Sequence, residues 1–553
     1  MDNVRLLLFM ALAFLGMLLY QAWQQDYATP VPQTPTAAAT GTAPTAPTDA
    51  PDAPLQADID GPGGVPVVPG GTGAPASQAT LIQVRTDLFD LTIDTRGGTI
   101  VDARLIDYPV AVDRPDEPFR LLSQRPSDFF ILQSGLLGAD KSRHPTHEAL
   151  FTSGEQRYVL EPGQDILDVD LHWQSPDGVE VTKRYTFQRG SHAIRLQHLL
   201  KNGSQQPWSG REYRQLQRGK PTESGNAFMY TYTGGAVYTQ ADKYQKYDFE
   251  DLGAGKLDRD TVDGWVAMIQ HYFLAAVVPP RAQQQHFYGK GLDNGRAVIG
   301  AYTPVLNVAP GEQSSFGGTL FIGPKLQAEL AEIAEGLDLT VDYGWLVFIA
   351  KPMYWVLEQI QGFVHNWGWT IIIFTILIKL AFFKLSETSY RSMANMRKLT
   401  PRIQALKDRY GDDKQRMQQA MMEMYKTEKI NPLGGCLPML VQIPFFIALY
   451  WVLLESVELR QAPWILWIDD LSIKDPFFVL PVIMGISMFV QQKLNPPPPD
   501  PMQAKIMLAL PLVFTVMFAF FPSGLVLYWV VNNLLSIAQQ WVITKRIEEG
   551  AKA

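Results

Sequence analysis

Long apolar runs near both ends of the chain constrain its fold more than any other feature. One run covers residues 4–23, and several more follow residue 365. A helix of about twenty apolar residues is long enough to cross the hydrocarbon of a bilayer. The overall composition hides this pattern, because 46% hydrophobic and 18% charged residues are close to the values of soluble proteins. The sequence therefore predicts a polytopic α-helical membrane protein with soluble parts between its spans.

Six runs are predicted to be transmembrane helices. The first is a retained anchor at residues 1–24, because no small-residue cleavage pattern closes the run at Tyr20-Gln-Ala-Trp23. The other five predicted spans are 366–385, 432–456, 477–494, 505–522 and 523–544. Residues 341–365 are amphipathic, with Lys351 and Glu358 interrupting the apolar pattern. This segment is predicted to be a helix that lies in the membrane interface.

A region of different character lies between the anchor and the interfacial helix. Residues 25–80 are rich in Thr, Pro, Ala and Gly. They are predicted to be a disordered linker, because they cannot bury enough apolar surface to offset the entropy of ordering. Residues 81–340 contain many short segments of alternating apolar and polar side chains, such as Phe89, Leu91 and Ile93. They predict a large all-β sandwich domain that ends with a short helix around Leu330.

The distribution of basic residues predicts the orientation in the membrane. Eleven Lys or Arg fall within 384–429, whereas the loop 457–476 contains two. The positive-inside rule places the first segment in the cytoplasm and the second on the outer side. Counting spans from there places the β-domain outside and both chain termini in the cytoplasm. It also makes 495–504 a cytoplasmic loop and 545–553 a cytoplasmic tail.

Lys379 is the first candidate functional residue, because it lies inside a predicted span. It follows Trp369 by ten residues, which is roughly 15 Å along a helix. A charge at that depth costs on the order of 3 kcal/mol unless it faces water or a partner. Snorkelling toward the edge marked by Lys384 is the alternative. Thr375, one turn earlier on the same face, favours a water-filled cavity that opens to the cytoplasm.

Other polar residues are predicted to share this cavity. Gln442 lies between two prolines in its predicted span, and the last predicted span carries a polar stripe. The stripe comprises Trp529, Asn532 or Asn533, Ser536 and Gln540. Hydrogen bonding between packed helices is the alternative for each residue alone. Together with Lys379, these residues favour a polar groove.

The basic segment 386–431 predicts a cytoplasmic helical hairpin with a methionine-rich face. Its two arms are separated by Gly411-Asp-Asp413. The methionines on this face are Met393 and Met396 in the first arm, and Met417, Met421 and Met424 in the second. Methionine adapts to varied apolar partners, so the face could receive hydrophobic nascent segments. Packing of the two arms against each other is an equally good explanation.

The sequence argues against several classes of function. Cys436 is the only cysteine, so the chain has no intrachain disulfide and no multi-cysteine metal site. A net charge of −8 argues against nucleic-acid binding. The chain has no phosphate loop, no nucleophile elbow and no HExxH motif, and the pair His144 and His147 lacks further metal ligands nearby. No catalytic residue, cofactor or metal is predicted, and the chain is predicted not to be an enzyme.

Two functions of other classes are alternatives for such a chain. A secondary transporter would use intramembrane polar groups, but it should show internal repeats, and none is found. A membrane enzyme could use the β-domain to bind glycans. Asp469 and Asp470 are its only candidate carboxylates, and they lack partners.

The membrane region resembles the YidC family of membrane insertases in its Gram-negative form. The matching stretches are Gly411-Asp-Asp-Lys-Gln-Arg416, Asn431-Pro-Leu-Gly-Gly-Cys-Leu-Pro438, Val457-Glu-Leu-Arg-Gln-Ala-Pro463, Asp500-Pro-Met-Gln503 and Phe521-Pro-Ser-Gly-Leu-Val-Leu-Tyr528. The order of anchor, linker and β-supersandwich domain also matches. The resemblance implies a five-helix insertase core that inserts, folds and assembles inner-membrane proteins, alone or with the Sec translocon.

The resemblance also implies roles for particular residues. Lys379 occupies the position of a groove residue that is usually arginine, and Thr375, Gln442 and Tyr528 match groove or substrate-contact positions. Trp529 stands where a tyrosine is common. The implied partners are nascent membrane proteins, the Sec translocon with its accessory subunits, ribosome–nascent chain complexes and membrane lipids. The implied location is the bacterial inner membrane, with the β-domain in the periplasm.

Overall fold

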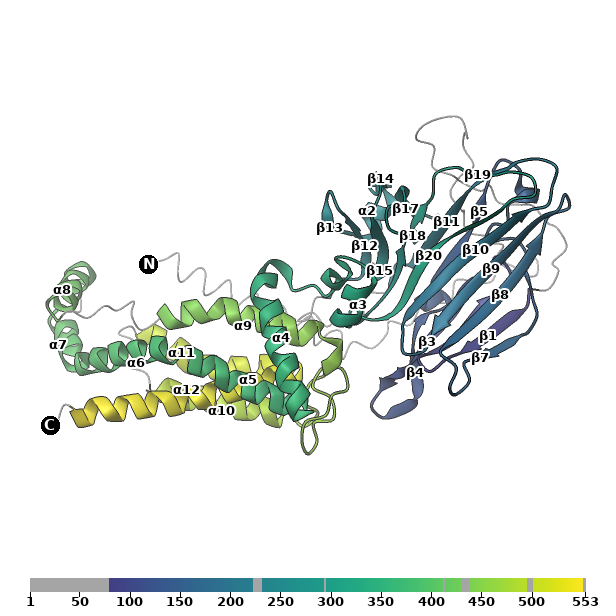
Figure 1. Cartoon of the computed structure of the whole chain (residues 1–553). Helices are drawn as coiled ribbons and strands as arrows, with labels where there is room; N and C mark the ends of the chain where they lie inside the picture. Colours follow the sequence, from purple (N-terminus) through teal and green to yellow (C-terminus); the bar gives the residue numbers. More distant parts are fainter. Residues whose placement is uncertain are drawn as a thin grey trace, which may run out of the picture. The chain divides into compact units, whose positions relative to one another are not determined.

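The computed structural model of the protein describes two compact units. The described residues are 79–221, 231–292, 295–410, 413–428, 437–494 and 501–550. The first unit is Met1–Val341 and the second is Asp342–Ala553. In their described parts, the first is built mainly of strands and the second of helices (Figure 1). The predicted anchor at 1–24, the predicted linker up to residue 78 and residues 495–500 of the predicted cytoplasmic loop lie outside the described residues.

Two large sheets form the described part of the β-unit. One has eleven strands in the order β14-β17-β18-β11-β5-β3-β2-β1-β7, with β19 pairing with β11 and β4 with β3. The other has nine strands in the order β13-β12-β15-β16-β20-β10-β9-β8-β6. Neighbouring strands pair antiparallel, except for β1 and β7, which are parallel.

The strands of the first sheet are β1 Leu81–Arg85, β2 Phe89–Asp94, β3 Thr99–Ala111, β4 Arg114–Leu122, β5 Phe130–Leu137, β7 Arg157–Val159, β11 Trp208–Gly219, β14 Asp258–Thr261, β17 Gln285–Gly291, β18 Arg296–Tyr302 and β19 Leu306–Val308. Those of the second are β6 Thr152–Ser153, β8 Ile166–Gln174, β9 Val179–Gln188, β10 Ala193–Asn202, β12 Gly234–Thr239, β13 Lys243–Tyr247, β15 Gly264–Ile269, β16 Phe273–Val278 and β20 Gln313–Pro324. Two short helices, α2 Phe249–Gly253 and α3 Gln327–Ile333, complete this unit.

Alternation of side chains along the strands builds the core between the two sheets. In β2, Phe89, Leu91 and Ile93 are buried, as their spacing predicts. One core cluster joins side chains from both sheets, namely Leu136, Val179, Val181, Leu200, Trp208 and Val308. The prediction of a large β-rich domain is confirmed, and Leu330 of α3 is buried at its end.

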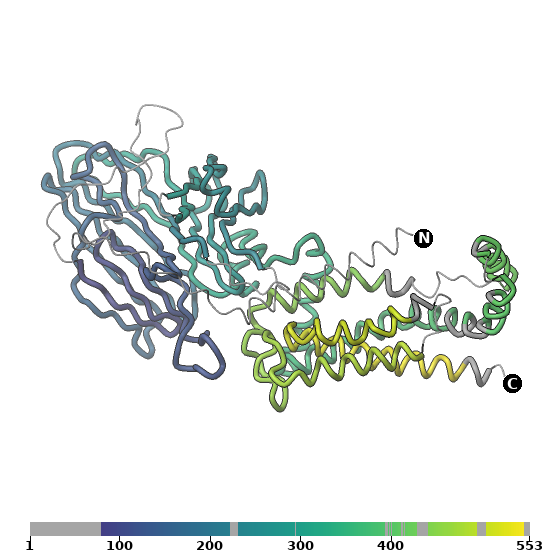
Figure 2. Tube along the Cα trace, turned by 180° about the vertical axis from the view of Figure 1, so that it is seen from behind, coloured from purple at the N-terminus to yellow at the C-terminus, as the bar shows by residue number. Residues whose placement is uncertain are grey.

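The helical unit is built around α12, which packs against α5, α6, α9 and α10. Helix α10 runs alongside α11 and α12, and α4 packs on α5 and α9 (Figures 1 and 2). The described helices are α4 Val347–Val364, α5 Trp367–Ala381, α6 Phe383–Lys398, α7 Thr400–Tyr410, α8 Lys414–Thr427, α9 Leu437–Glu455, α10 Val479–Leu494, α11 Pro501–Phe518 and α12 Ser523–Gly550. Helices α5, α9, α10, α11 and α12 therefore cover most of the five C-terminal segments predicted as spans.

By length and hydropathy, no single helix of the described residues is sufficient to cross a membrane. Helix α5 and the segment Phe383–Ser392 of α6 meet the requirement together, as a pair bent by 63°. The segments Val441–Glu455, Val479–Leu494 and Lys505–Phe518 are apolar but shorter. The number of spans stays a prediction.

The structure differs from the sequence-based prediction near both ends of α6. The predicted span 366–385 is not one straight helix, because α5 ends at Ala381 and α6 starts at Phe383 after the bend. The bend occurs where a mostly apolar pattern changes to an amphipathic one, so the two helices bury different faces. The predicted first hairpin arm is also two helices, because α7 begins anew at Thr400. Pro401 then lies in the first turn of α7, where a missing N–H breaks no helical hydrogen bond.

Candidate functional site

Lys379 lies in the last turn of α5, and its ammonium reaches the neighbouring helix α12. Nζ donates a hydrogen bond to Ser536 Oγ at 2.7 Å, and that hydroxyl donates to the carbonyl oxygen of Asn532 at 2.7 Å. Lys379 is half-buried, whereas Ser536 is buried. Among the described residues, no carboxylate forms an ion pair with Lys379. An ammonium has three N–H groups, so two remain for water or for a bound segment.

Thr375 lies one turn before Lys379 and is buried. Its Oγ1 donates to the carbonyl oxygen of Ile371 at 2.6 Å, so the hydroxyl proton is used inside α5. The hydroxyl oxygen keeps its capacity to accept a hydrogen bond. The structure thus places Thr375 beside the lysine along the helix without joining the two side chains.

Asn533 faces a different helix from Ser536. Its Nδ2 donates to Ser487 Oγ of α10 at 3.1 Å. Seven residues later, Gln540 Nε2 donates to the carbonyl oxygen of Leu494 at 3.3 Å, at the end of α10. The predicted stripe on α12 therefore divides into one part that contacts α5 and another that contacts α10. For Asn533 and Gln540, hydrogen bonding between packed helices explains the polar side chains.

Tyr528 and Trp529 belong to an aromatic cluster with helix α9. The ring of Phe446 lies 5.9 Å from that of Tyr528 and 4.4 Å from that of Trp529, centroid to centroid. Phe518 of α11 lies 5.5 Å from Trp529. The indole Nε1 of Trp529 is enclosed and has no hydrogen-bond acceptor among the described residues. Because a buried indole N–H normally donates to an acceptor, this group would bond to water or to a peptide carbonyl that reached the cluster.

Gln442 lies in α9 and is half-buried. It precedes Phe446 by four residues, so the two positions share one face of the helix. Gln442 therefore lies on the face of α9 that carries Phe446 of the aromatic cluster. Sequence reasoning missed Phe446 and Phe518, because an apolar residue in an apolar helix carries no signal that separates it from ordinary core or lipid-facing residues.

Sequence reasoning also missed the contribution of α6. Tyr390 donates from its hydroxyl to the carbonyl oxygen of Ser536 at 3.5 Å. Gln539 Nε2 donates to the carbonyl oxygen of Phe383 at 3.5 Å. These long hydrogen bonds hold the part of the chain just after the bend against α12, beside the Lys379–Ser536 contact. No signal in the sequence pointed to them, because Tyr390 falls in the segment predicted as a hairpin.

Helix α8, which packs on α7, carries three of the five methionines of the predicted face. Met417, Met421 and Met424 of α8 and Met396 of α6 are half-buried, and the side chain of Met393 lies outside the described part. Arg402 of α7 forms an ion pair with Glu428, just after α8. Asp413 caps α8 by accepting a hydrogen bond from the backbone N–H of Arg416 at 3.0 Å.

Helix α4 has one apolar face exposed and the other packed. The exposed side chains on and just before α4 are Trp345, Phe348, Trp355 and Phe363, and the buried ones are Ala350, Met353, Tyr354 and Leu357. The hydroxyl of Tyr354 donates to Glu458 Oε1 at 2.6 Å, which ties the helix to the segment after α9. Large exposed aromatic side chains along one face are typical of helices that lie in a membrane interface.

Comparison with known proteins covers nearly the whole described chain. The profile of the YidC periplasmic domain matches residues 81–356, and that of the 60Kd inner membrane protein matches residues 359–550. The membrane protein insertase YidC of Methylococcus capsulatus is 53% identical over 553 residues, covering 100% of this chain and 99% of that protein. The chain belongs to the YidC family of membrane protein insertases. The YidC insertase of Thioalkalivibrio sulfidiphilus is 52% identical over 567 residues, with both chains covered completely.

Membership in the YidC family makes the chain an inner-membrane protein insertase and not an enzyme. The prediction of family and function is confirmed, and the transporter and membrane-enzyme alternatives are removed. Among solved structures, an active YidC insertase with its first transmembrane domain resolved has a TM-score of 0.38 at 18% identity, covering 84% of this chain and 92% of that one. A galactose mutarotase related enzyme from Lactobacillus acidophilus has a TM-score of 0.30 at 11% identity, covering 44% and 97%.

Proposed function

We propose that this insertase moves polar segments of its passengers through a hydrated groove whose floor is Lys379. The observation that carries the proposal is the Lys379–Ser536 contact between α5 and α12. A half-buried ammonium with a single hydroxyl partner among the described residues needs water or a ligand for its two other N–H groups. The groove opens to the cytoplasm, where a nascent chain arrives.

The positive charge attracts the polar or acidic outer part of a passenger while that part is midway through the membrane. A passenger carboxylate supplies, for a short time, the counter-charge that α5 and α12 do not provide. A point charge is enough for this attraction, so an arginine at position 379 should work as well. The two-pronged geometry of a guanidinium is not required.

The aromatic cluster of Tyr528, Trp529 and Phe446 is proposed as the second contact surface for the passenger. Its rings offer apolar surface to the transmembrane segment, and Trp529 Nε1 offers a hydrogen bond to a passenger carbonyl. Gln442 and Thr375 add polar atoms on α9 and α5. Asn533 supports the groove indirectly, because its hydrogen bond to Ser487 fixes α12 against α10.

The remaining parts of the chain are proposed to serve recruitment and placement. Six spans, with both termini in the cytoplasm and the β-domain in the periplasm, agree with the eleven basic residues within 384–429. The exposed aromatic face of α4 fits a helix that lies on the outer leaflet and contacts lipid. The methionine-bearing segment around α8 suits contact with ribosome–nascent chain complexes. The Sec translocon with its accessory subunits is the proposed partner for multi-span passengers.

The test compares Lys379→Leu and Lys379→Arg in liposomes that contain the purified full chain and no other protein. The passengers are two single-span proteins that differ only in having an acidic or a neutral outer tail. We expect Lys379→Leu to reduce insertion of the acidic passenger about tenfold, equivalent to roughly 1.4 kcal/mol of lost stabilisation. Lys379→Arg should retain insertion.

Lys384→Leu is the matched control, because Lys384 lies five residues later and its side chain is 91% exposed. This variant should insert both passengers at the parental rate. Full activity of Lys379→Leu on the acidic passenger would defeat the proposal. An equal loss for both passengers would show that the lysine acts on folding and not on passenger charge.

A further inference from the structure

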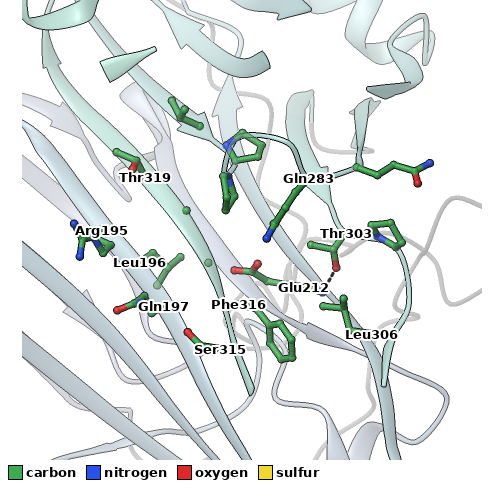
Figure 3. Close-up of a pocket in the computed structure, with 17 residues that line it drawn as sticks. Arg195, Leu196, Gln197, Glu212, Gln283, Thr303, Leu306, Ser315, Phe316 and Thr319 are labelled. Carbon is green, nitrogen blue, oxygen red and sulfur yellow. Dashed lines mark hydrogen bonds between the residues drawn. The ribbon is translucent and has the colours of Figure 1, made fainter. Parts of the chain in front are cut away.

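A cavity of about 500 Å³ lies between the two sheets of the β-unit (Figure 3). One wall comes from β10, β20 and the end of β16, and the other from β11 and the segment after β18. Its lining mixes apolar side chains with amides, hydroxyls, the carboxylate of Glu212 and the exposed side chain of Arg195. The volume lies within the range of small-molecule sites in proteins. Insertion as described above uses none of these residues.

The carboxylate of Glu212 is enclosed by the protein and is only partly satisfied. Oε1 bonds to His198 Nδ1 at 3.1 Å across the two sheets. Oε2 lies 3.6 Å from Arg214 Nη2, which is an ion pair but too long for a hydrogen bond. In the described part of the chain, Glu212 Oε2 and all three guanidinium nitrogens of Arg214 have no hydrogen-bond partner. Buried groups of this kind normally bond to water or to a ligand.

Strand β20 carries a glycine, Gly318, where it passes the side chain of Arg214. A Cβ on Gly318 would lie 1.8 Å from Arg214 Nη1 and 2.7 Å from the backbone carbonyl oxygen of Val278, so a glycine is required where the strand passes the guanidinium. Gly318 also lines the cavity. The guanidinium of Arg214 therefore lies directly behind the cavity wall, and the carboxylate of Glu212 forms part of that wall.

The charges around Glu212 indicate which ligands fit. Burial alone would raise the pKa of Glu212, but Arg214 and His198 hold it below its ordinary value, so the group is an anion. Arg214 already supplies the opposite charge, and a second cation is not needed. A hydroxyl group can donate to Glu212 and accept from the Gln283 amide at once, whereas an ammonium cannot accept and a carboxylate cannot donate.

The rest of the lining suits a ligand that carries several hydroxyls on an apolar ring. Gln197, Gln283 and Gln284 each offer an amide that both donates and accepts. Figure 3 shows Gln283 and Glu212 extending toward each other across the middle of the cavity. Phe316 stacks on Trp208 with ring centroids 5.9 Å apart, which fixes an apolar surface at the cavity.

We infer that this cavity binds a neutral saccharide through paired hydroxyls held by Glu212 and Gln283, with the apolar face of the sugar ring on Phe316. The β-unit then has a binding activity of its own, separate from insertion. Its role would be to attach the insertase to a glycan. The inference does not depend on the groove at Lys379.

The test uses the full chain in lipid nanodiscs with two disaccharide probes, maltose and N,N′-diacetylchitobiose. An uncharged peptide of similar size is the comparison ligand. Binding is measured by saturation-transfer NMR and calorimetry. We expect saturable binding of a disaccharide and no binding of the peptide. Gln283→Ala should weaken disaccharide binding about five- to tenfold, as expected for losing hydrogen bonds from an amide.

Gln313→Ala is the matched control, because Gln313 is exposed on β20 outside the cavity lining. It should bind the disaccharide as the parent does. Gln283 is exposed, so its variant should fold normally, unlike a variant of the enclosed Glu212. Failure of both disaccharides to bind at millimolar concentration overturns the inference. Unchanged binding in Gln283→Ala, or binding of the peptide instead, overturns it as well.

Discussion

Each unit of the molecule contains a lysine inside its packed structure, and the two lysines differ in burial and in hydrogen-bond partners. Lys183 of β9 is completely enclosed and donates to the carbonyl oxygens of Gly97 at 2.6 Å and Ser134 at 3.1 Å. It lies near the rings of Phe151 and Tyr185. Lys379 of α5 is half-buried and has one hydroxyl partner among the described residues. The β-unit supplies fixed acceptors for Lys183, whereas the ammonium of Lys379 keeps N–H groups for water or a ligand.

We interpret the difference as that between a structural charge, Lys183, and the proposed functional one, Lys379. The β-unit surrounds Lys183 with fixed acceptors and places the carboxylate of Glu212 near enough to act on it. Burial still lowers the pKa of Lys183 to about 7. In the helical unit, Ser536 Oγ is the one hydrogen-bond acceptor of Lys379 among the described residues. A buried charge without a full set of hydrogen-bond partners costs stability. The presence of Lys379 is therefore best explained by water or a passenger that supplies the missing partners.

Removing Glu212 should produce the largest effect on the enclosed charges. Glu212→Ala leaves Arg214 and Lys183 without a counter-charge in the core, and it should destabilise the β-unit by about 3–5 kcal/mol. Urea unfolding of the full chain, followed by circular dichroism, measures the change. Glu117→Ala removes an exposed carboxylate paired with Arg114 and should stay within about 0.5 kcal/mol. Equal effects of the two variants would contradict the distinction between enclosed and solvent-exposed charges.

The pH dependence of stability gives a second, smaller effect. The folded-state pKa of Lys183, about 7, lies below its ordinary value of 10.5, so the unfolded chain binds more protons between these values. Stability should therefore rise with pH across this window, by on the order of 3 kcal/mol between about pH 7 and pH 9.5. Lys183→Met should remove this rise, as measured by urea unfolding at both pH values. A slope that persists in the variant would assign the effect to other groups.

Much of the fold follows from local patterns in the sequence. Alternation in β2 predicts which side chains enter the core, because a strand has only two faces. The apolar runs predict α5 and α9 to α12 to within several residues. The bend at Phe382 could not be predicted, since it depends on contacts of α6 with α12 that are more than a hundred residues apart in sequence.

The candidate site was predictable only in part. Lys379 stands out because a charge in an apolar run is costly. The separate roles of Asn532 and Asn533 could not be assigned, because adjacent residues on a helix point about 100° apart and the sequence does not say which neighbour lies on which side. Phe446 carries no sequence signal, because its role depends on the packing of α9 against α12.

The smallest expected effect concerns the hydroxyl that contacts Lys379. If the groove is hydrated, water replaces the hydroxyl in Ser536→Ala, and insertion of the acidic passenger should fall by less than about threefold. Asn533→Ala is the comparison, because it breaks a hydrogen bond between α12 and α10 and should cost about 0.6 kcal/mol of helix packing. The liposome assay and thermal unfolding measure the two effects. A tenfold loss in Ser536→Ala would mean that the lysine depends on the hydroxyl in a dry site.

Access of water to the Lys379–Ser536 contact tests the central claim most directly. In a Cys436→Ser background, Ser536→Cys is exposed to a membrane-impermeant maleimide on the cytoplasmic side of membrane vesicles. Lys384→Cys, at an exposed position, is the positive control, and Val526→Cys, buried on the same helix as Ser536, is the negative one. We predict that the cysteine at 536 reacts, and that a stalled passenger slows the reaction. A cysteine at 536 that stays as unreactive as the one at 526 would contradict the hydrated groove.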